Sequence, residues 1–141
     1  MSLNIAIVGA GAIGGYLGVK LALSGCNVTF IARGENLKAI QANGMTLNLE
    51  DGTSLHAPQV KACTIDQATP HDYVFLTMKS HQVSPVAAEI GRLCHDNTAV
   101  VTMQNVCLGG ISTTWWASIK TANSAPSILA ARSGNTLVRS A

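Results

Sequence analysis

Residues 4–18 read NIAIVGAGAIGGYLG, and this stretch decides the fold class. Its first five residues are mostly apolar and do not alternate with polar ones, which is typical of a strand buried on both faces of a parallel sheet. Glycine-rich sequence follows at once. From Ala12 to Ser24 the pattern is helical, with Gly25 placed to end the helix and with apolar positions at Ile13, Tyr16, Leu17, Leu21 and Leu23. A buried strand that leads through glycines into a helix predicts the start of a β-α-β unit.

The chain continues this alternation as far as residue 103. Further buried strands are predicted over 27–32, 73–78 and 99–103, and further helices over 35–43 and 84–93. Alternation with a period of two on both sides of Asp51-Gly52 predicts a hairpin over 45–57. Together these elements predict an α/β fold, in which a doubly wound, mostly parallel sheet carries one hairpin excursion.

The composition indicates one soluble domain and excludes several kinds of partner. The 141 residues suffice for one domain, and 48% hydrophobic against 11% charged residues argues against disorder. A net charge of +2 from scattered residues provides no basic surface for nucleic acid or anionic membrane. The apolar run near the start has no preceding Lys or Arg and is interrupted by Lys20, so a soluble, cytoplasmic protein is expected.

Metal binding is not expected either. The four cysteines include no C-x-x-C pair, and the four histidines show no metal-ligand spacing. Reduced thiols and no metal site are therefore predicted.

The glycines form a G-x-G-x-x-G motif whose position favours dinucleotide binding. Gly9 permits a tight turn, Gly11 lets the backbone approach a pyrophosphate, and Gly14 lets the helix pack closely on the strand. The phosphates would then rest on free N–H groups at the helix N-terminus. The alternative is a turn that is merely rich in glycine. The predicted cofactor-binding residues of the loop are Gly9, Ala10, Gly11, Ala12, Ile13 and Gly14.

The end of the second strand indicates which dinucleotide is bound. NAD sites usually carry an acid there, for the ribose 2′-hydroxyl. This chain has Arg33, whose guanidinium can pair with a 2′-phosphate, so NADPH is predicted. The alternative is a solvated Arg33, with Glu35 binding the ribose.

Two polar residues follow other strands of the predicted sheet. Lys79 comes directly after YVFLTM, and Asn105 comes after AVVTM and Gln104. Because ligands of open α/β sheets bind outside the carboxyl ends of the strands, both residues are candidates for contact with cofactor and substrate. Each could equally be a solvated surface residue.

In combination these features resemble the N-terminal domain of ketopantoate reductases (2-dehydropantoate 2-reductases). The resemblance covers residues 1–105 and is carried by IAIVGAGAIGGYLG, FIARGENLKAIQANGMTL, FLTMKSHQV and AVVTMQN. It implies a Rossmann-type NADP-binding domain over 1–105, in which the glycine loop and Arg33 bind NADPH. It also implies that Lys79 and Asn105 contact both cofactor and substrate.

The resemblance further implies the reaction. Members of the family reduce a 2-oxo acid, typically ketopantoate on the route to pantothenate, and a lysine of a second, helical domain is the general acid. That C-terminal helical domain is expected to be absent from this chain. No catalytic residue is then assigned within it, the chain is expected to be inactive, and its exposed apolar surface would favour self-association. The other hypothesis is a non-enzymatic NADP-binding or interaction module.

Residues 106–141 differ in character from the rest, and an aberrant or poorly structured tail is predicted there. The segment is rich in Ser, Thr and Ala and lacks acids, and SILAARSGNTLV contains at most a helical turn or two. Bacterial members of the family continue M-Q-N-G-V-P-W-W-Y-F, whereas this chain reads MQNVCLGGISTTWW. Codons exist for Val106 to Trp115 that, once one G is restored ahead of them, read G-V-P-W-W-Y-F in the shifted frame. A one-base deletion near codon 106 explains this agreement; a genuine divergent C-terminus is the alternative.

Overall fold

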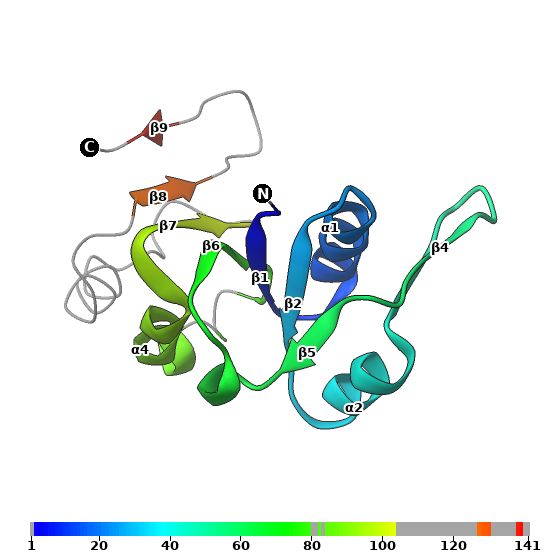
Figure 1. Ribbon diagram of the computed structural model, residues 1–141, viewed down its shortest axis with the longest axis horizontal. Helices are drawn as coiled ribbons and strands as arrows, with labels where there is room; N and C mark the ends of the chain where they lie inside the picture. Colours follow the sequence, from blue (N-terminus) through cyan, green and yellow to red (C-terminus); the bar gives the residue numbers. More distant parts are fainter. Residues whose placement is uncertain (1, 80–81, 83, 104–126, 131–137, 140–141) are drawn as a thin grey trace.

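The computed structural model describes residues 2–79, 82, 84–103, 127–130 and 138–139 (Figure 1). The strands are β1 (Asn4–Val8), β2 (Asn27–Ile31), β3 (Met45–Asn48), β4 (Ser54–Ala57), β5 (Lys61–Cys63), β6 (His71–Leu76), β7 (Cys94–Thr102), β8 (Ser127–Ala130) and β9 (Val138–Arg139). The α-helices are α1 (Ala12–Leu23), α2 (Gly34–Asn43) and α4 (Ala87–Ile90). Short 3-10 helices are η1 (Ile65–Gln67), η2 (Ser84–Val86) and η3 (Gly91–Leu93).

The main sheet has the strand order β5-β2-β1-β6-β7-β8-β9. All its pairings are parallel except that of β8 with β9. From β1 the chain first winds outward through β2 to β5, then returns to β6 on the other side of β1 and winds outward again. The predicted doubly wound α/β sheet is thus confirmed, and its direction reverses between β1 and β6. In such sheets ligands bind in the crevice at this switch point, outside the carboxyl ends of the strands.

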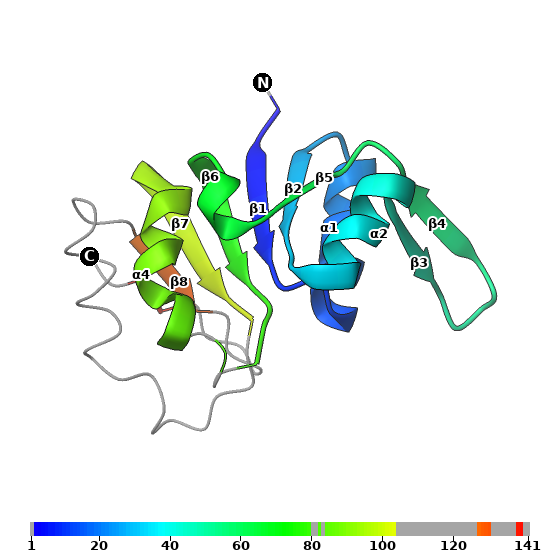
Figure 2. The same ribbon diagram turned by 90° about the horizontal axis from the view of Figure 1, so that it is seen from below.

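The central strands are buried on both faces, which explains why their sequences do not alternate. Ile5 and Ile7 of β1 pack into the core under α1 and α2, while Ala6 and Val8 pack into the opposite core under α4. The hairpin of β3 and β4 is separate from the main sheet and projects beyond α1 (Figure 2). Met45, Leu47 and Leu55 pack from the hairpin against the α1 core.

Several elements differ from the prediction. Strand β5 was missed, because three residues are too few to show a period. The predicted strand over 73–78 begins at His71 and ends at Leu76, and the one over 99–103 begins already at Cys94. The predicted helix over 84–93 is divided into η2, α4 and η3. After Pro126, where no regular element was predicted, Ser127–Ala130 form β8, which pairs with β7, with Ser127 opposite Ala99.

Helix α1 contacts the sheet through small residues rather than through its large apolar ones. Ile13, Tyr16 and Leu23 are 52%, 51% and 47% exposed. The buried residues of the helix are Gly14, Gly15, Gly18, Val19 and Ala22. A glycine face lets the helix axis come close to the strands, which brings the N-terminus of α1 directly over the carboxyl end of β1.

Candidate nucleotide-binding site

The glycine motif forms the loop between β1 and α1, at the switch point of the sheet. Gly9 has φ +107°, in the region that favours glycine, and its N–H donates to the Ile31 carbonyl at 3.2 Å. Gly11 is the N-cap of α1 and has an extended backbone. The loop therefore leaves β1, turns sharply and enters the helix with free N–H groups at the carboxyl edge of the sheet.

The three motif glycines have three different surroundings. A Cβ on Gly9 would lie 3.1 Å from the Met78 backbone nitrogen. A Cβ on Gly14 would overlap the Gly9 carbonyl oxygen and lie 2.6 Å from Thr77 Oγ1. Beside Gly11, in contrast, a Cβ would meet nothing within 4 Å. Gly9 and Gly14 are thus needed by the fold itself, whereas the space at Gly11 is open to a ligand.

Thr77 holds this loop from the end of β6. Its N–H donates to the Val8 carbonyl at 3.1 Å, and its hydroxyl lies 2.7 Å from the Gly9 carbonyl oxygen and 3.1 Å from that of Val8. Thr77 was not predicted as a site residue. The signal was present, because Thr77 is a polar residue at the end of a buried strand, like the neighbouring Lys79 that was singled out.

A pocket of about 390 Å³ opens beside the loop. Apolar residues from the ends of β1 and β2 line it, together with Ile65, Met78 and Val86. Arg33, the N-cap of α2, is part of its wall and is exposed. An apolar surface next to a guanidinium suits a flat base joined to a phosphorylated ribose.

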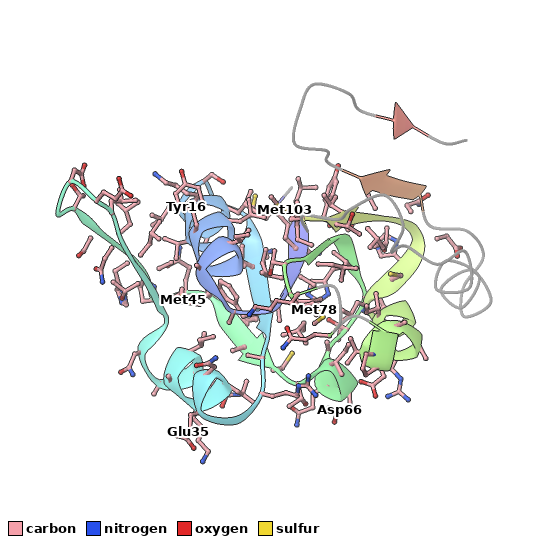
Figure 3. All side chains as sticks on the ribbon, turned by 180° about the vertical axis from the view of Figure 1, so that it is seen from behind. Tyr16, Glu35, Met45, Asp66, Met78 and Met103 are labelled. Carbon is pink, nitrogen blue, oxygen red and sulfur yellow. The ribbon has the colours of Figure 1, made fainter. Side chains whose placement is uncertain are left out.

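Glu35, the alternative ribose ligand, does not line this pocket. Its carboxylate pairs with Lys38 Nζ at 3.3 Å, and its side chain is 91% exposed. It points outward from α2, away from the sheet (Figure 3). Of the two candidates, the structure therefore places Arg33, and not Glu35, in the wall of this pocket.

Lys79 and Asn105 are not brought into this pocket by the described structure. Lys79 is exposed in the loop after β6, where its N–H donates to Gln82 Oε1 at 3.2 Å and its carbonyl accepts from the Gln82 N–H at 2.8 Å. Asn105 lies outside the described residues. The roles assigned to both remain predictions.

Other polar residues line the pocket without having been singled out: Asn36, Thr64, Asp66, Gln82 and Glu89. Asn36 follows Arg33 by three residues on α2, a spacing that places both on one side of the helix. Thr64 and Asp66 follow β5, so missing that strand also hid them. Burial raises the pKa of the adjacent Cys63 thiol, and the Asp66 carboxylate raises it further, so Cys63 stays protonated beside the pocket wall.

A second hollow, of about 610 Å³, lies at the opposite, amino ends of the strands and is lined in part by Asn4, Asn27 and His71. No motif residue reaches it. Within the described residues there is no group of three or more His, Cys, Asp or Glu side chains that could hold a metal ion. No helix in the described part of the chain has the length and apolar character needed to cross a membrane.

Comparison with known proteins identifies the family. Residues 5–113 match the family model of ketopantoate reductase PanE/ApbA. The chain belongs to this family. The match runs past Asn105, to residue 113. A 2-dehydropantoate 2-reductase of Mesorhizobium japonicum is 45% identical over 115 residues, which are 81% of this chain and 33% of that protein. The chain spans about a third of the length of the curated relatives it matches.

Solved structures of relatives share the fold. The 2-dehydropantoate 2-reductase of Geobacter metallireducens is 28% identical with a TM-score of 0.70, over 94% of this chain and 44% of that one. A D-mandelate dehydrogenase, solved with NADH and anilino(oxo)acetate, is 25% identical with a TM-score of 0.71, over 89% of this chain and 40% of that one. The sheet and glycine loop described above are thus the Rossmann-type N-terminal domain of this family.

Proposed function

We propose that this chain binds NADPH, as the nucleotide-binding domain of a 2-dehydropantoate 2-reductase-like oxidoreductase. The open space at Gly11 carries the proposal. A pyrophosphate fits there against the N-terminus of α1, and the pocket walled by Arg33 begins beside it. The residues present thus fit the cofactor: the loop from Gly9 to Gly14 would hold the pyrophosphate, and Arg33 the 2′-phosphate.

Family membership supports the reaction. When bound, NADPH supplies the hydride that reduces the 2-carbonyl of a 2-oxo acid, a step of pantothenate biosynthesis in the cytoplasm. Lys79 and Asn105, which follow strands at the same edge of the sheet, are proposed to contact cofactor and substrate. No general acid is assigned among the 141 residues. A proton donor must lie within hydrogen-bond reach of the developing alkoxide, so we expect the purified chain alone to be inactive with ketopantoate.

The choice of NADPH over NADH rests on Arg33. The D-mandelate dehydrogenase structure, which shares this fold, contains NADH. The fold alone therefore does not determine whether NADH or NADPH binds, and individual side chains must do so. In this chain a guanidinium is part of the pocket wall, while the nearby Glu35 carboxylate is turned to Lys38. An arginine attracts the dianionic 2′-phosphate, whereas an acid in its place would repel it.

Fluorescence titration of the 141-residue chain with NADPH and NADH tests the proposal. NADPH should bind more tightly, and Arg33→Ala should weaken NADPH about 10- to 100-fold, because hydrogen bonds to charged groups contribute about 1.5–3 kcal/mol. The affinity for NADH should change little in the same variant. Lys20→Ala is the control, since Lys20 is a cation in the last turn of α1 that does not line the pocket. Equal affinities of the unaltered chain for the two dinucleotides would overturn the assignment of NADPH.

We also propose that residues 106–141 are the family sequence read in a shifted frame. Two observations favour the alternative, a genuine divergent C-terminus: the family match extends to residue 113, and β8 pairs with β7. Sequencing the gene across codons 105 and 106 tests it directly. An uninterrupted frame, with related loci that encode the same segment, would refute the proposed deletion. Self-association through apolar surface is a further expectation, which sedimentation of the purified chain can measure.

A further inference from the structure

The Thr77 hydroxyl lies against the carbonyl of Gly9, and the direction of this carbonyl decides where the Ala10 N–H points. Thr77 Oγ1 lies 2.7 Å from the Gly9 carbonyl oxygen, and the Thr77 N–H donates to Val8, the last residue of β1. We infer that Thr77 is a positioning residue: its hydroxyl turns the Gly9–Ala10 peptide so that the Ala10 N–H faces the pyrophosphate. This inference rests on the proposed function, because it assigns a role at the same cofactor site.

The geometry of the peptide unit carries the argument. In a trans peptide the C=O and the N–H that follows it point in opposite directions. The structure holds the Gly9 carbonyl toward Thr77 and Gly14, since a Cβ on Gly14 would overlap that oxygen. The Ala10 N–H consequently points the other way. Because Gly9 has no Cβ, Gly9 itself restricts the ψ angle that turns this peptide only weakly, and the Thr77 hydroxyl adds a contact that fixes the orientation.

The orientation matters because the expected ligand is an anion. A peptide turned the other way would present the partial negative charge of the Gly9 oxygen to the phosphates and remove one donor. A dipole that is fixed before the ligand arrives stabilises the bound charge without a cost of reorganisation. Thr77 is suited to fix it, because its own N–H is tied to the sheet and its β-branched side chain has restricted χ1.

A test must separate this role from ordinary structural support. We would measure by calorimetry the binding of two ligands to the 141-residue chain: NADPH, and adenosine 2′-phosphate, which has no pyrophosphate. Thr77→Val, which keeps the shape and loses the hydroxyl, should weaken NADPH about tenfold, the worth of one hydrogen bond to a peptide group. Binding of adenosine 2′-phosphate should not change. Thr77→Ser, which restores the hydroxyl, should bind NADPH within about twofold of the unaltered chain.

Thr98 offers a matched control at the amino end of β6, whereas the glycine loop lies at the carboxyl ends of the strands. Its hydroxyl donates to the His71 carbonyl and accepts from the His95 N–H at 2.7 Å, far from the glycine loop. Thr98→Val should lower the melting temperature and leave both affinities unchanged. The inference is overturned if Thr77→Val keeps the affinity for NADPH, or if it lowers the affinities for NADPH and adenosine 2′-phosphate to the same extent.

Two further outcomes are decisive. If Thr77→Val and the smaller Thr77→Ala both fail to fold while Thr77→Ser folds, the hydroxyl supports the fold rather than the ligand, and the inference is wrong. If the unaltered chain binds adenosine 2′-phosphate and NADPH equally well, the pyrophosphate makes no contribution, and the positioning role fails while the assignment of Arg33 stands. Absence of binding by either ligand refutes the proposed function itself.

Discussion

The ring of Phe30 occupies the space in which a side chain on Gly18 would stand. A Cβ on Gly18 would overlap the Phe30 Cζ and lie 2.8 Å from Cε1, and Phe30 is completely buried between α1 and the sheet. Neither residue can move away without opening the core. We expect Gly18→Ala to lower the free energy of unfolding by about 1–3 kcal/mol, as overpacking of a core does. Urea denaturation followed by circular dichroism would measure it.

Gly15, on the same helix, provides the control. A Cβ there would lie 3.9 Å from the Met45 Cε, an ordinary contact. Because alanine favours a helix over glycine, Gly15→Ala should be neutral or stabilising by up to about 1 kcal/mol. Equal destabilisation by the two substitutions would show that the Phe30 contact does not set the limit.

Substitutions at different glycines of the motif should affect stability and ligand binding separately. Gly11→Ala places a methyl group in open space and needs no unusual φ, so the melting temperature should stay the same. The methyl would stand where the pyrophosphate approaches, and we expect NADPH affinity to fall at least tenfold, on the order of the loss of one charged hydrogen bond.

Gly14→Ala, in contrast, should lower the stability of the protein. Its methyl would collide with the Gly9 carbonyl and with Thr77, so the protein should lose stability even without a ligand. Normal NADPH binding by Gly11→Ala would contradict the placement of the pyrophosphate at this loop.

How far the sequence predicted the structure can be seen along α1. The strand, the glycine loop and the helix were found where predicted, because each has its own local signal: an unbroken apolar run, glycines at fixed spacing, and a glycine after the last turn. Apart from Gly14, the buried face of the helix was not foreseen. Ile13 and Tyr16 are exposed, and the face is made of glycines because Phe30, on the neighbouring strand, fills the space. Such complementarity between distant residues leaves no periodic trace.

In the site, too, residues with a local sequence signal were predicted and residues without one were not. Arg33 was predicted from its position after a strand, and the structure places it in the pocket wall. The residues contributed by the segment after β5, Thr64 and Asp66, were missed with the strand itself. Thr77 was missed although it follows a buried strand, because its contact with the Gly9 carbonyl depends on how the loop after β1 folds back over the end of β6.

His71 should make stability depend on pH. It is almost completely buried, its Nδ1 has no hydrogen-bond partner within the described structure, and burial lowers the pKa of the imidazole below its ordinary value of 6.5. Below pH 6.5 the unfolded chain then binds more protons than the folded one, so stability falls as the pH drops from 6.5 through the folded pKa.

Melting temperatures between pH 7.5 and pH 5 test this dependence. His71→Gln should flatten the slope, because the group whose pKa changes on folding has been removed. His56→Gln, which alters an exposed histidine of the hairpin, is the matched control. If His71→Gln has the same slope as the unaltered chain, another group is responsible.

Limited proteolysis should decide how firmly the last part of the chain is held. Strand β8 is four residues long and pairs with β9, which has only two residues. If residues 106–141 are out-of-frame sequence, trypsin should cut rapidly after Lys120 and release the segment that contains β8. The bond after Lys61, within β5, should survive the same digest and serves as the internal control. Mass spectrometry of the products would identify the cuts. If the segment that contains β8 stays attached for as long as β5 stays intact, the shifted frame is contradicted. That outcome would support a selected extension of the sheet.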